Sequence, residues 1–261
     1  MLGQENLVEK IKRYSLDEFP HTLLLEGNKG SGKHMLLDII SNHLKLPLLE
    51  ITDKLDLESI SGYYLRSEPY IYIIDSDKIS IKNQYSILKF IEEPLNNSFI
   101  ILLTSNRYKL LDTIRNRCRI LAMNKYTKDV LSDIFPDVDP KIISFCETPG
   151  DVLILKNFDL IKEEEFVEKV IYKSDIANFS NMFKISEHIA LNNETDKLPL
   201  PIFFKLLKMK ILLDIKIEDN SNLFKKYIIV EEYFNKSFLP NIDNKYLLDN
   251  FLINFWRSSR Q

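Results

Sequence analysis

Three glycines and two lysines fall within the first seven positions of one short segment, Gly27-Asn28-Lys29-Gly30-Ser31-Gly32-Lys33-His34. The chain has only six glycines, and three of them lie here. Glycine lets backbone N–H groups wrap closely around phosphate oxygens, because it adopts dihedral angles that a side chain forbids. The spacing predicts a phosphate-binding loop of the Walker A type, in which Lys33 reaches the β- and γ-phosphates of a nucleotide. The alternative is a glycine-rich turn that only joins a strand to a helix.

The segments on either side of this loop favour the first interpretation. Residues 21–26 form a short apolar run typical of a buried strand, and residues 33–44 have the periodicity of a helix. A strand, a glycine loop, a lysine and a helix in this order form the context in which a Walker A match is specific. The helix N-terminus would add its partial positive charge to the loop.

The residue after the lysine departs from the motif. A Walker A loop has Ser or Thr there, whose hydroxyl binds Mg²⁺, whereas this chain has His34. Imidazole is a poor ligand for a hard cation that prefers oxygen. The loop therefore predicts nucleotide binding, and His34 argues against metal-assisted chemistry.

Two further apolar runs, at 70–74 and 99–103, have the length and β-branched content of buried strands. Each stops at small polar residues, Asp75-Ser76-Asp77 after the first run and Thr104-Ser105-Asn106 after the second. The carboxyl ends of parallel strands meet at one edge of an open α/β sheet, where ligands bind. Both polar clusters are therefore expected to share one site with the glycine loop.

Asp75 has the position of a Walker B aspartate, which can hold Mg²⁺ through water. Active enzymes of this type usually carry Glu next, to orient the attacking water, but here that residue is Ser76. Asp77 lies two residues on, and because a strand rises about 3.3 Å per residue, we expect it to be too far along to substitute. No metal site is assigned, apart from Asp75 if Mg²⁺ is bound. The alternative role for Asp75 is a helix N-cap.

These runs, with 47–51 and 119–123, give five strands that alternate with helices, which predicts a doubly wound parallel sheet. Helices are expected within 1–19 and at 33–44, 55–65, 79–94 and 107–116. The first would end at Pro20 and the fourth at Pro94. The residues expected to face inward are Leu7, Ile11, Tyr14, Met35, Leu36, Ile39, Ile40, Leu44, Tyr85, Leu88 and Ile91.

From Tyr126 onward the strand pattern stops, and the chain is expected to be helical to its end. Short helices are predicted at 127–135, 140–146 and 150–158, and the acidic run Glu163-Glu164-Glu165 indicates a solvated helix face. The helix at 201–217 is apolar on most sides, and that at 245–257 has a long apolar face. Such faces indicate either an ordinary helical core or contacts with other subunits. The expected domains are 1–124 (P-loop), 125–162 (helical lid) and 163–261 (helical collar).

Composition limits the kinds of partner and the cellular compartment that we expect for this chain. The net charge is −3, so the whole chain is not expected to attract nucleic acid. Two cysteines, Cys118 and Cys146, make neither a disulfide framework nor a four-ligand zinc module. The four histidines are scattered, and no apolar run approaches 18 residues. A reducing, cytoplasmic protein without zinc and without a membrane span is the simplest interpretation.

Several segments resemble, in the right order, the AAA+ clamp-loader family, and within it the delta-prime type of DNA polymerase III subunit. They are Gly3-Gln4-Glu5 (an N-terminal box), Ser86-Ile87-Leu88-Lys89-Phe90-Ile91-Glu92-Glu93-Pro94, Leu102-Leu103-Thr104-Ser105-Asn106 (sensor 1) and Leu110-Leu111-Asp112-Thr113-Ile114-Arg115-Asn116-Arg117-Cys118. The resemblance covers about residues 1–160. The C-terminal third matches only in its helical character and length.

In that family a Ser-Arg-Cys sequence supplies an arginine finger to the ATP site of a neighbouring subunit. Asn116-Arg117-Cys118 stands there, so the resemblance implies this role for Arg117, whose guanidinium can neutralise charge on a transferring phosphate. A surface arginine paired with an acid is the alternative. Arg115, Arg117 and Arg119 alternate, which leaves contact with a DNA backbone open. Cys118 is expected to be a small buried residue rather than a reactive thiol.

The resemblance implies an ATPase-deficient subunit, because His34, Ser76 and the lack of a sensor 2 arginine at 149–153 all depart from a motor subunit. It would bind ATP or ADP with Mg²⁺, without the zinc module of some relatives. Its partners would be a motor subunit and a delta-like subunit in a five-membered ring, the sliding clamp, and primed DNA through the complex. The alternatives are an active AAA+ ATPase of a divergent loader, and a DNA-binding adaptor that keeps the fold.

Overall fold

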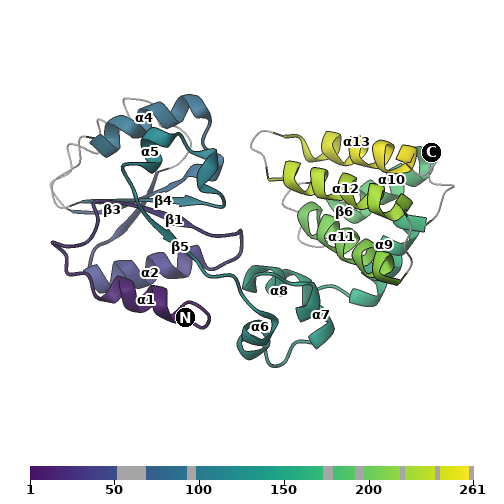
Figure 1. Ribbon diagram of the computed structural model, residues 1–261, viewed down its shortest axis with the longest axis horizontal. Helices are drawn as coiled ribbons and strands as arrows, with labels where there is room; N and C mark the ends of the chain where they lie inside the picture. The colour runs from purple at the N-terminus through teal and green to yellow at the C-terminus, as the bar shows by residue number, and fades with distance from the viewer. Residues whose placement is uncertain are drawn as a thin grey trace. The chain divides into compact units, whose positions relative to one another are not determined.

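The computed structural model describes residues 1–51, 69–92, 98–172, 179–191, 197–217, 221–238 and 242–258, with no side-chain description for 179–183. The chain divides into two compact units (Figure 1). The first unit is Met1–Asp137 with Cys146–Gly150, and the second is Val138–Phe145 with Asp151–Gln261. The division into domains at 124 and 162 stays a prediction.

A five-stranded parallel sheet forms the centre of the first unit, in the order β2-β3-β4-β1-β5. Each strand begins and ends within one residue of the range expected from the sequence, because each apolar run stops at polar residues or proline. The strands are β1 (Thr22–Glu26), β2 (Leu48–Ile51), β3 (Ile71–Asp75), β4 (Phe99–Thr104) and β5 (Arg119–Ala122). The doubly wound parallel sheet is confirmed.

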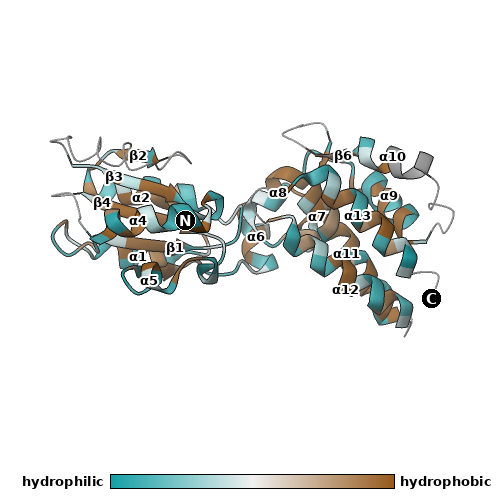
Figure 2. Ribbon diagram, turned by 90° about the horizontal axis from the view of Figure 1, so that it is seen from above, coloured by the Kyte–Doolittle hydropathy of each residue, from teal (hydrophilic) through white to brown (hydrophobic). Residues whose placement is uncertain are grey.

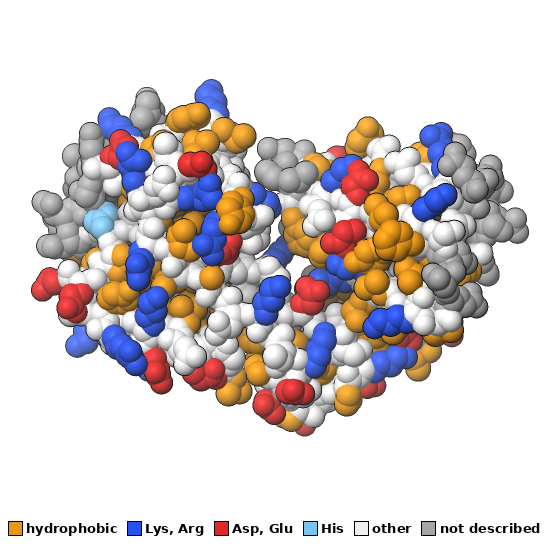
Figure 3. Space-filling view, viewed as in Figure 1, with side chains coloured by type: hydrophobic (Ala, Val, Ile, Leu, Met, Phe, Trp, Pro, Cys, Tyr) orange, Lys and Arg blue, Asp and Glu red, His pale blue; other side chains and the backbone are white. Residues whose placement is uncertain are grey.

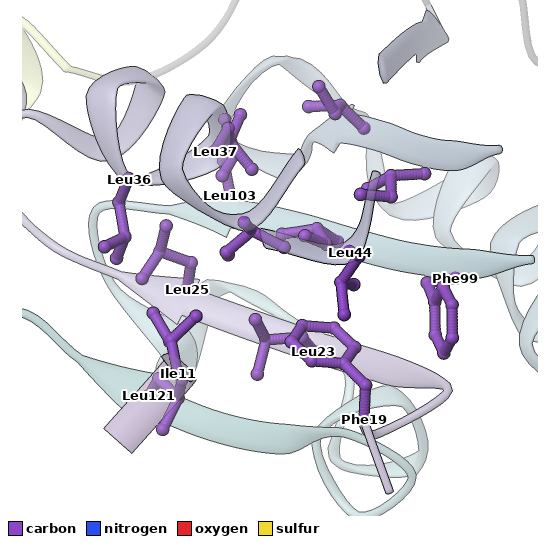
Figure 4. Close-up of a cluster of buried hydrophobic side chains, with 14 of the residues drawn as sticks. Ile11, Phe19, Leu23, Leu25, Leu36, Leu37, Leu44, Phe99, Leu103 and Leu121 are labelled. Carbon is purple, nitrogen blue, oxygen red and sulfur yellow. The ribbon is translucent and has the colours of Figure 1, made fainter. Parts of the chain in front are cut away.

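Helices cover both faces of this sheet (Figure 1). Helices α1 (Glu5–Lys12) and α2 (Lys33–Leu44) pack on one face, and α4 (Ile81–Glu92) and α5 (Asp112–Arg115) pack on the other. Because successive side chains of a strand point to opposite faces, β1 sends Leu23 and Leu25 into one core and Leu24 into the other. Figure 4 shows the first of these cores, with Leu23 and Leu25 among the side chains of α2.

Several helix bounds differ from the expected ones. Helix α1 ends at Lys12, well before Pro20, and the segment expected as one helix at 107–116 is a 3₁₀ turn, η2 (Arg107–Lys109), followed by α5. Helix α4 begins at Ile81, two residues later than expected. The helix expected at 55–65 and the stop expected at Pro94 lie outside the described residues.

Two residues predicted to face inward are exposed, Met35 at 57% and Tyr85 at 61%. In α2 the buried position belongs to Leu37, which was not expected to be buried. In α4 the side chain of Gln84 is buried in place of Tyr85, and its amide donates to Lys109 O (3.1 Å) and accepts from Leu111 N (2.9 Å). A buried polar side chain is tolerated when it is hydrogen-bonded, so the helix turns its glutamine rather than its tyrosine inward.

The rest of the chain is mainly helical, as expected, and none of the described helices is long and apolar enough to cross a membrane. The strand pattern does not stop at Tyr126, however, since two short strands, β6 (Ile189–Ala190) and β7 (Leu198–Pro199), pair in parallel. The helices are α6 (Lys128–Ile134), α7 (Pro140–Phe145), α8 (Pro149–Leu155), α9 (Leu160–Tyr172), α10 (Phe179–His188), α11 (Leu200–Ile217), α12 (Ser221–Lys236) and α13 (Asn244–Arg257).

Helices α11, α12 and α13 form the aromatic core of the second unit. The apolar face expected at 245–257 is buried, and it includes Phe251, whose ring meets that of Phe204 edge-on with centroids 4.9 Å apart. The buried residues of α13 are Leu247, Leu248, Phe251, Leu252, Phe255 and Trp256. Figure 2 shows hydrophobic stretches along these helices, whereas several loops are hydrophilic. An ordinary core explains the first half of α11. In its second half Leu213 and Ile217 are exposed, as are Phe224 and Ile228 of α12.

The acidic run at 163–165 is not wholly solvated, which corrects the expectation for it. Glu163 is 5% exposed, and its carboxylate lies 2.8 Å from Nε2 of His188. The imidazole also packs on Phe166, with ring centroids 4.1 Å apart. A charge is buried at a tolerable cost only when it is paired, and the partner of Glu163 is 25 residues away in the sequence.

Substitution of Gln84 by Leu tests the reversed faces of α4. The change keeps the volume but leaves Lys109 O and Leu111 N without the bonds that Gln84 makes, so we expect a loss of about 1 to 3 kcal/mol in the free energy of unfolding. Tyr85→Ala is the matched control and should cost under about 0.5 kcal/mol, as surface changes do. Urea denaturation followed by circular dichroism measures both, and a larger loss for Tyr85→Ala would contradict this assignment.

Candidate functional site

The glycine-rich loop lies at the carboxyl edge of the sheet, between β1 and α2. Its first residue, Gly27, donates from its N–H to the carbonyl of Thr104 at the end of β4 (2.9 Å). Gly30 and Gly32 have φ values of +79° and +92°, in the left-handed region where a side chain is strained. A Cβ atom on Gly30 would also come within 2.9 Å of Cα of Gly150. The backbone therefore has the conformation for which a phosphate loop requires glycine.

Lys33 begins α2 and folds its side chain over this loop. Its Nζ donates to the carbonyls of Gly27 and Asn28. Burial lowers the pKa of Lys33, and the negative charges of Asp77 and, less strongly, Asp75 oppose that shift. The ammonium group thus lies within the electrostatic reach of both carboxylates, at the edge where the sequence placed a shared site.

Other parts of the first unit hold the loop in place. Ser31 is buried, and its carbonyl accepts a hydrogen bond from the Tyr126 hydroxyl (2.9 Å). The N–H of Gly150 donates to Gly30 O (3.0 Å). Gln4, in the N-terminal box, is fully buried and exchanges two hydrogen bonds with the backbone of Asn124, just after β5. The N-terminal box thus has a structural role, because its hydrogen bonds hold the N-terminus against the residues that follow β5.

Asp75 ends β3 and has the N-cap role that the sequence analysis gave as its alternative, whereas its Walker B role stays a prediction. Its side chain caps the 3₁₀ turn η1 (Ser76–Lys78) by accepting from the N–H of Asp77 (3.2 Å), as an N-cap residue does. Its carboxylate also pairs with Lys78 at 3.0 Å. Ser76 is buried and donates to Leu103 O, so its hydroxyl is turned into the sheet rather than toward the loop.

The position of Asp77 corrects the sequence analysis. The expectation that it lies too far along a strand assumed that β3 continues, but the chain turns back in η1 directly after Asp75. One carboxylate oxygen of Asp77 accepts from the Thr104 hydroxyl (3.1 Å), and the other accepts from the N–H of Ser105 (2.7 Å). Asp77 therefore joins the Walker B segment to the sensor 1 segment, Thr104-Ser105-Asn106.

One acidic group at this edge, Glu26, was missed from the sequence. Glu26, the last residue of β1, accepts from the backbone N–H of Arg107 (2.9 Å) and from its Nε (2.6 Å). Burial alone would raise the pKa of Glu26, but the hydrogen bonds and charge of Arg107 outweigh it and lower the net pKa. The sequence indicated this role only by an acidic residue at the end of an apolar strand. The remaining sensor residue, Asn106, accepts from Tyr108 N (2.9 Å) and so caps η2.

The donors and acceptors here fit the phosphates of a nucleotide better than they fit Mg²⁺. The loop backbone, the α2 N-terminus and Lys33 supply positive charge and N–H donors. His34 is exposed, and no hydroxyl follows Lys33. Among the described residues no group of three or more His, Cys, Asp or Glu side chains is placed to hold a metal ion.

Arg117 lies at the opposite, amino edge of the sheet. It precedes β5, whose first residue, Arg119, is in register with Leu23 near the start of β1. The four residues from Leu23 to Gly27 span about 13 Å, so Arg117 and the loop of the same chain are well separated. Its side chain is 43% exposed and pairs with Glu92 at 2.8 Å. It is thus a surface arginine paired with an acid, as the simpler alternative expected.

The surroundings of Arg117 form a shallow open depression of 460 Å³, lined by Pro20, His21, Thr22, Ile91, Glu92, Arg117 and Arg119. Arg115 does not line this depression; it pairs with Asp112, and its guanidinium carbon lies 5.0 Å from the ring centre of Tyr108.

Burial raises the pKa of the half-buried Cys118 to about 12, so its thiol is protonated at neutral pH. Basic and acidic side chains are interspersed on the face drawn in Figure 3.

Comparisons with known proteins found similar sequences among DNA polymerase III subunits. Residues 50–127 match the family model described as DNA polymerase III, delta subunit. The delta′ subunit of DNA polymerase III from Bacillus subtilis (strain 168) is 26% identical over 58% of this chain and 57% of that protein. The gamma subunit from Buchnera aphidicola subsp. Schizaphis graminum is 26% identical over 52% and 46%. The chain spans about half the length of these relatives.

Two solved structures have the same fold. A DNA polymerase III gamma subunit-related protein from Thermotoga maritima superposes with a TM-score of 0.57 at 15% identity, covering 99% of this chain and 100% of that chain. A mutant of RuvB from Thermotoga maritima gives 0.51 at 22% identity, covering 82% and 77%. The strand order and the glycine-rich loop give this unit the fold of P-loop proteins of the AAA+ class. Within that class, the sequence is similar to DNA polymerase III subunits, as the resemblance to the clamp-loader family predicted.

Substitution of Arg107 by Met tests the Glu26–Arg107 pair. A folded-state pKa below the ordinary value of 4.5 adds stability above that pH and loses it as the pH falls through the folded-state pKa. Arg107→Met should therefore cost about 1.5 to 3 kcal/mol at pH 7 and clearly less at pH 3.5. Urea denaturation at the two pH values measures the difference.

Arg13→Met is the control, since Arg13 belongs to an exposed pair with Glu9 at 3.6 Å and should have little effect at either pH. An equal loss at both pH values for Arg107→Met would show that the pair does not hold the sensor 1 segment electrostatically.

Proposed function

We propose that this chain is a non-hydrolysing clamp-loader subunit of the delta-prime type. In a cytoplasmic hetero-oligomeric ring it presents Arg117 to the ATP site of a neighbouring motor subunit and helps load a sliding clamp on primed DNA. The motor subunit and a delta-like subunit are its proposed partners in a five-membered ring.

The observation that carries this proposal is the position of Arg117. An exposed arginine at the amino edge of the sheet cannot serve the phosphate loop at the carboxyl edge of its own chain, but it is free to enter a site on a neighbour. The Glu92 pair does not prevent this, because both side chains are about half exposed and such pairs are weak. A guanidinium supplied in trans can neutralise charge on a transferring phosphoryl group.

The carboxyl edge supports the absence of turnover. His34 supplies no hydroxyl for Mg²⁺, and the hydroxyl of Ser76 is turned into the sheet. At the start of α8, where motor subunits would carry a sensor 2 arginine, this chain has Gly150 against Gly30 and a buried Asp151 paired with Lys205 at 2.6 Å. The carboxylate of Asp77 is bound to the sensor 1 segment.

The exposed apolar residues at the end of α11 and the start of α12 support an assembly role for the second unit. They are Leu213, Ile217, Phe224 and Ile228. Exposed apolar residues that gather on one surface typically mark a protein contact. On this proposal the second unit is the collar that holds the ring together, and the first unit faces the neighbouring nucleotide site.

A second candidate function is an active ATPase of a divergent loader. The observation that favours it is the loop itself, with its two left-handed glycines and Lys33 in position. This candidate requires Mg²⁺-dependent ATP turnover by the isolated chain, abolished by Lys33→Ala. The leading proposal requires no turnover above background, and a phosphate-release assay on the purified chain separates the two.

Arg117→Ala tests the proposed finger. In a complex reconstituted with the motor subunit, the substitution should lower the partner's ATP turnover by about 10³-fold or more, the effect of an arginine supplied in trans. Arg119→Ala is the matched control, because Arg119 is an exposed arginine at the same edge, and it should leave turnover within about threefold.

Arg117→Lys separates charge from geometry, since an ammonium group lacks the planar fork of the guanidinium. It should restore only a small part of the lost rate. Unchanged ATP turnover with Arg117→Ala in an intact complex would contradict the arginine-finger role. Size-exclusion chromatography of the complex verifies that each variant assembles.

A further inference from the structure

Asp77 stands out at the carboxyl edge because its two carboxylate oxygens are both bound to the sensor 1 segment. They accept from the Thr104 hydroxyl (3.1 Å) and from the N–H of Ser105 (2.7 Å). Thr104 is 1% exposed, so this bond lies in a protected environment. A charge-assisted hydrogen bond of this kind is stronger than a neutral one. The sensor 1 donors are therefore already bound to an anion that belongs to the chain.

The location of this anion follows from Lys33. In a phosphate loop the lysine ammonium marks the place of the β- and γ-phosphates. Among the acidic groups that act on the Lys33 ammonium, Asp77 has the largest effect and Asp75 the next. Thr104 pairs with Glu26 across β1 and β4, directly before the loop. Asp77 thus lies beside the end of the site where a third phosphate would extend.

Asp75 differs from Asp77 in its bonding. Its carboxylate caps η1 through the N–H of Asp77 and pairs with Lys78, within the turn that follows β3. Of these two carboxylates, only that of Asp77 has a described hydrogen bond that joins the turn to sensor 1. A third phosphate would therefore lie beside the negative charge of Asp77, and repulsion between like charges disfavours that arrangement.

We infer that Asp77 makes the phosphate loop selective for a nucleoside diphosphate over a triphosphate, by holding the sensor 1 donors with its own carboxylate. The inference rests on the proposed nucleotide binding by this loop and names the ligand class that the loop accepts. Binding of a triphosphate requires the carboxylate to release Thr104 and Ser105 or to tolerate the extra phosphate beside it. A diphosphate ends before this point and requires neither change.

Isothermal titration calorimetry of the full chain tests the inference, with ADP and with an ATP analogue whose β–γ bridge cannot be hydrolysed, both in Mg²⁺. The wild-type chain should bind ADP at least about tenfold more tightly than the analogue. Asp77→Asn keeps the shape and removes the charge, and it should bring the two dissociation constants to within about threefold of each other. The change should come from tighter binding of the triphosphate analogue.

Asp112→Asn is the control, because Asp112 is an exposed carboxylate paired with Arg115, and it should leave the wild-type ratio unchanged. If melting curves show that Asp77→Asn is unfolded, Asp77→Ser replaces it, since a small uncharged hydroxyl also removes the negative charge.

Equal affinity of the wild-type chain for both nucleotides, binding of neither, or an unchanged ratio in the Asp77 variant would overturn the inference. None of these results bears on Arg117, whose role is decided by the partner's turnover in the complex. Failure of the selectivity is therefore distinguishable from failure of the proposed function.

Discussion

The pairing of β4 between β1 and β3 is the constraint on which the candidate site depends. The parallel register ends the three strands at the same edge, so the phosphate loop, the turn at Asp75 and sensor 1 become neighbours although they are far apart in the sequence. The hydrogen bond from Gly27 N to Thr104 O extends this pairing into the loop itself. Because all three segments begin where a buried strand ends, the apolar cores on the two faces of the sheet also fix the polar site at its edge.

Acidic side chains organise this edge as much as the loop does. Asp77 binds sensor 1, Glu26 binds Arg107, and Asp75 caps η1. Each carboxylate is partly buried and paired, which is the condition for keeping a charge inside a protein. In a working ATPase we would expect some of these positions to contact Mg²⁺, water or phosphate. Here they bind the chain itself, which is the arrangement expected on the proposal that this subunit does not hydrolyse ATP.

The second unit is organised around aromatic packing rather than hydrogen-bonded chemistry. Phe203, Phe204 and Phe251 fill its centre, and the buried carboxylate of Glu163 is paired with His188. This core accounts for most of the apolar character that made α11 and α13 conspicuous in the sequence. The apolar residues left exposed on α11 and α12 are those that packing within this chain does not explain, and they form the proposed collar contact.

The sequence by itself determined the parallel sheet, its strand bounds to within one residue, the phosphate loop and the family resemblance, because these depend on local runs and on spacing. It did not determine the neighbours of Asp77, of Glu26 or of Glu163, whose partners lie 27, 81 and 25 residues away. Periodicity also predicted Tyr85 inside and overlooked Gln84, since only the tertiary structure shows which backbone groups need a buried amide. Local pattern sets which segments form strands and helices, whereas pairing of buried polar groups is decided when distant segments meet.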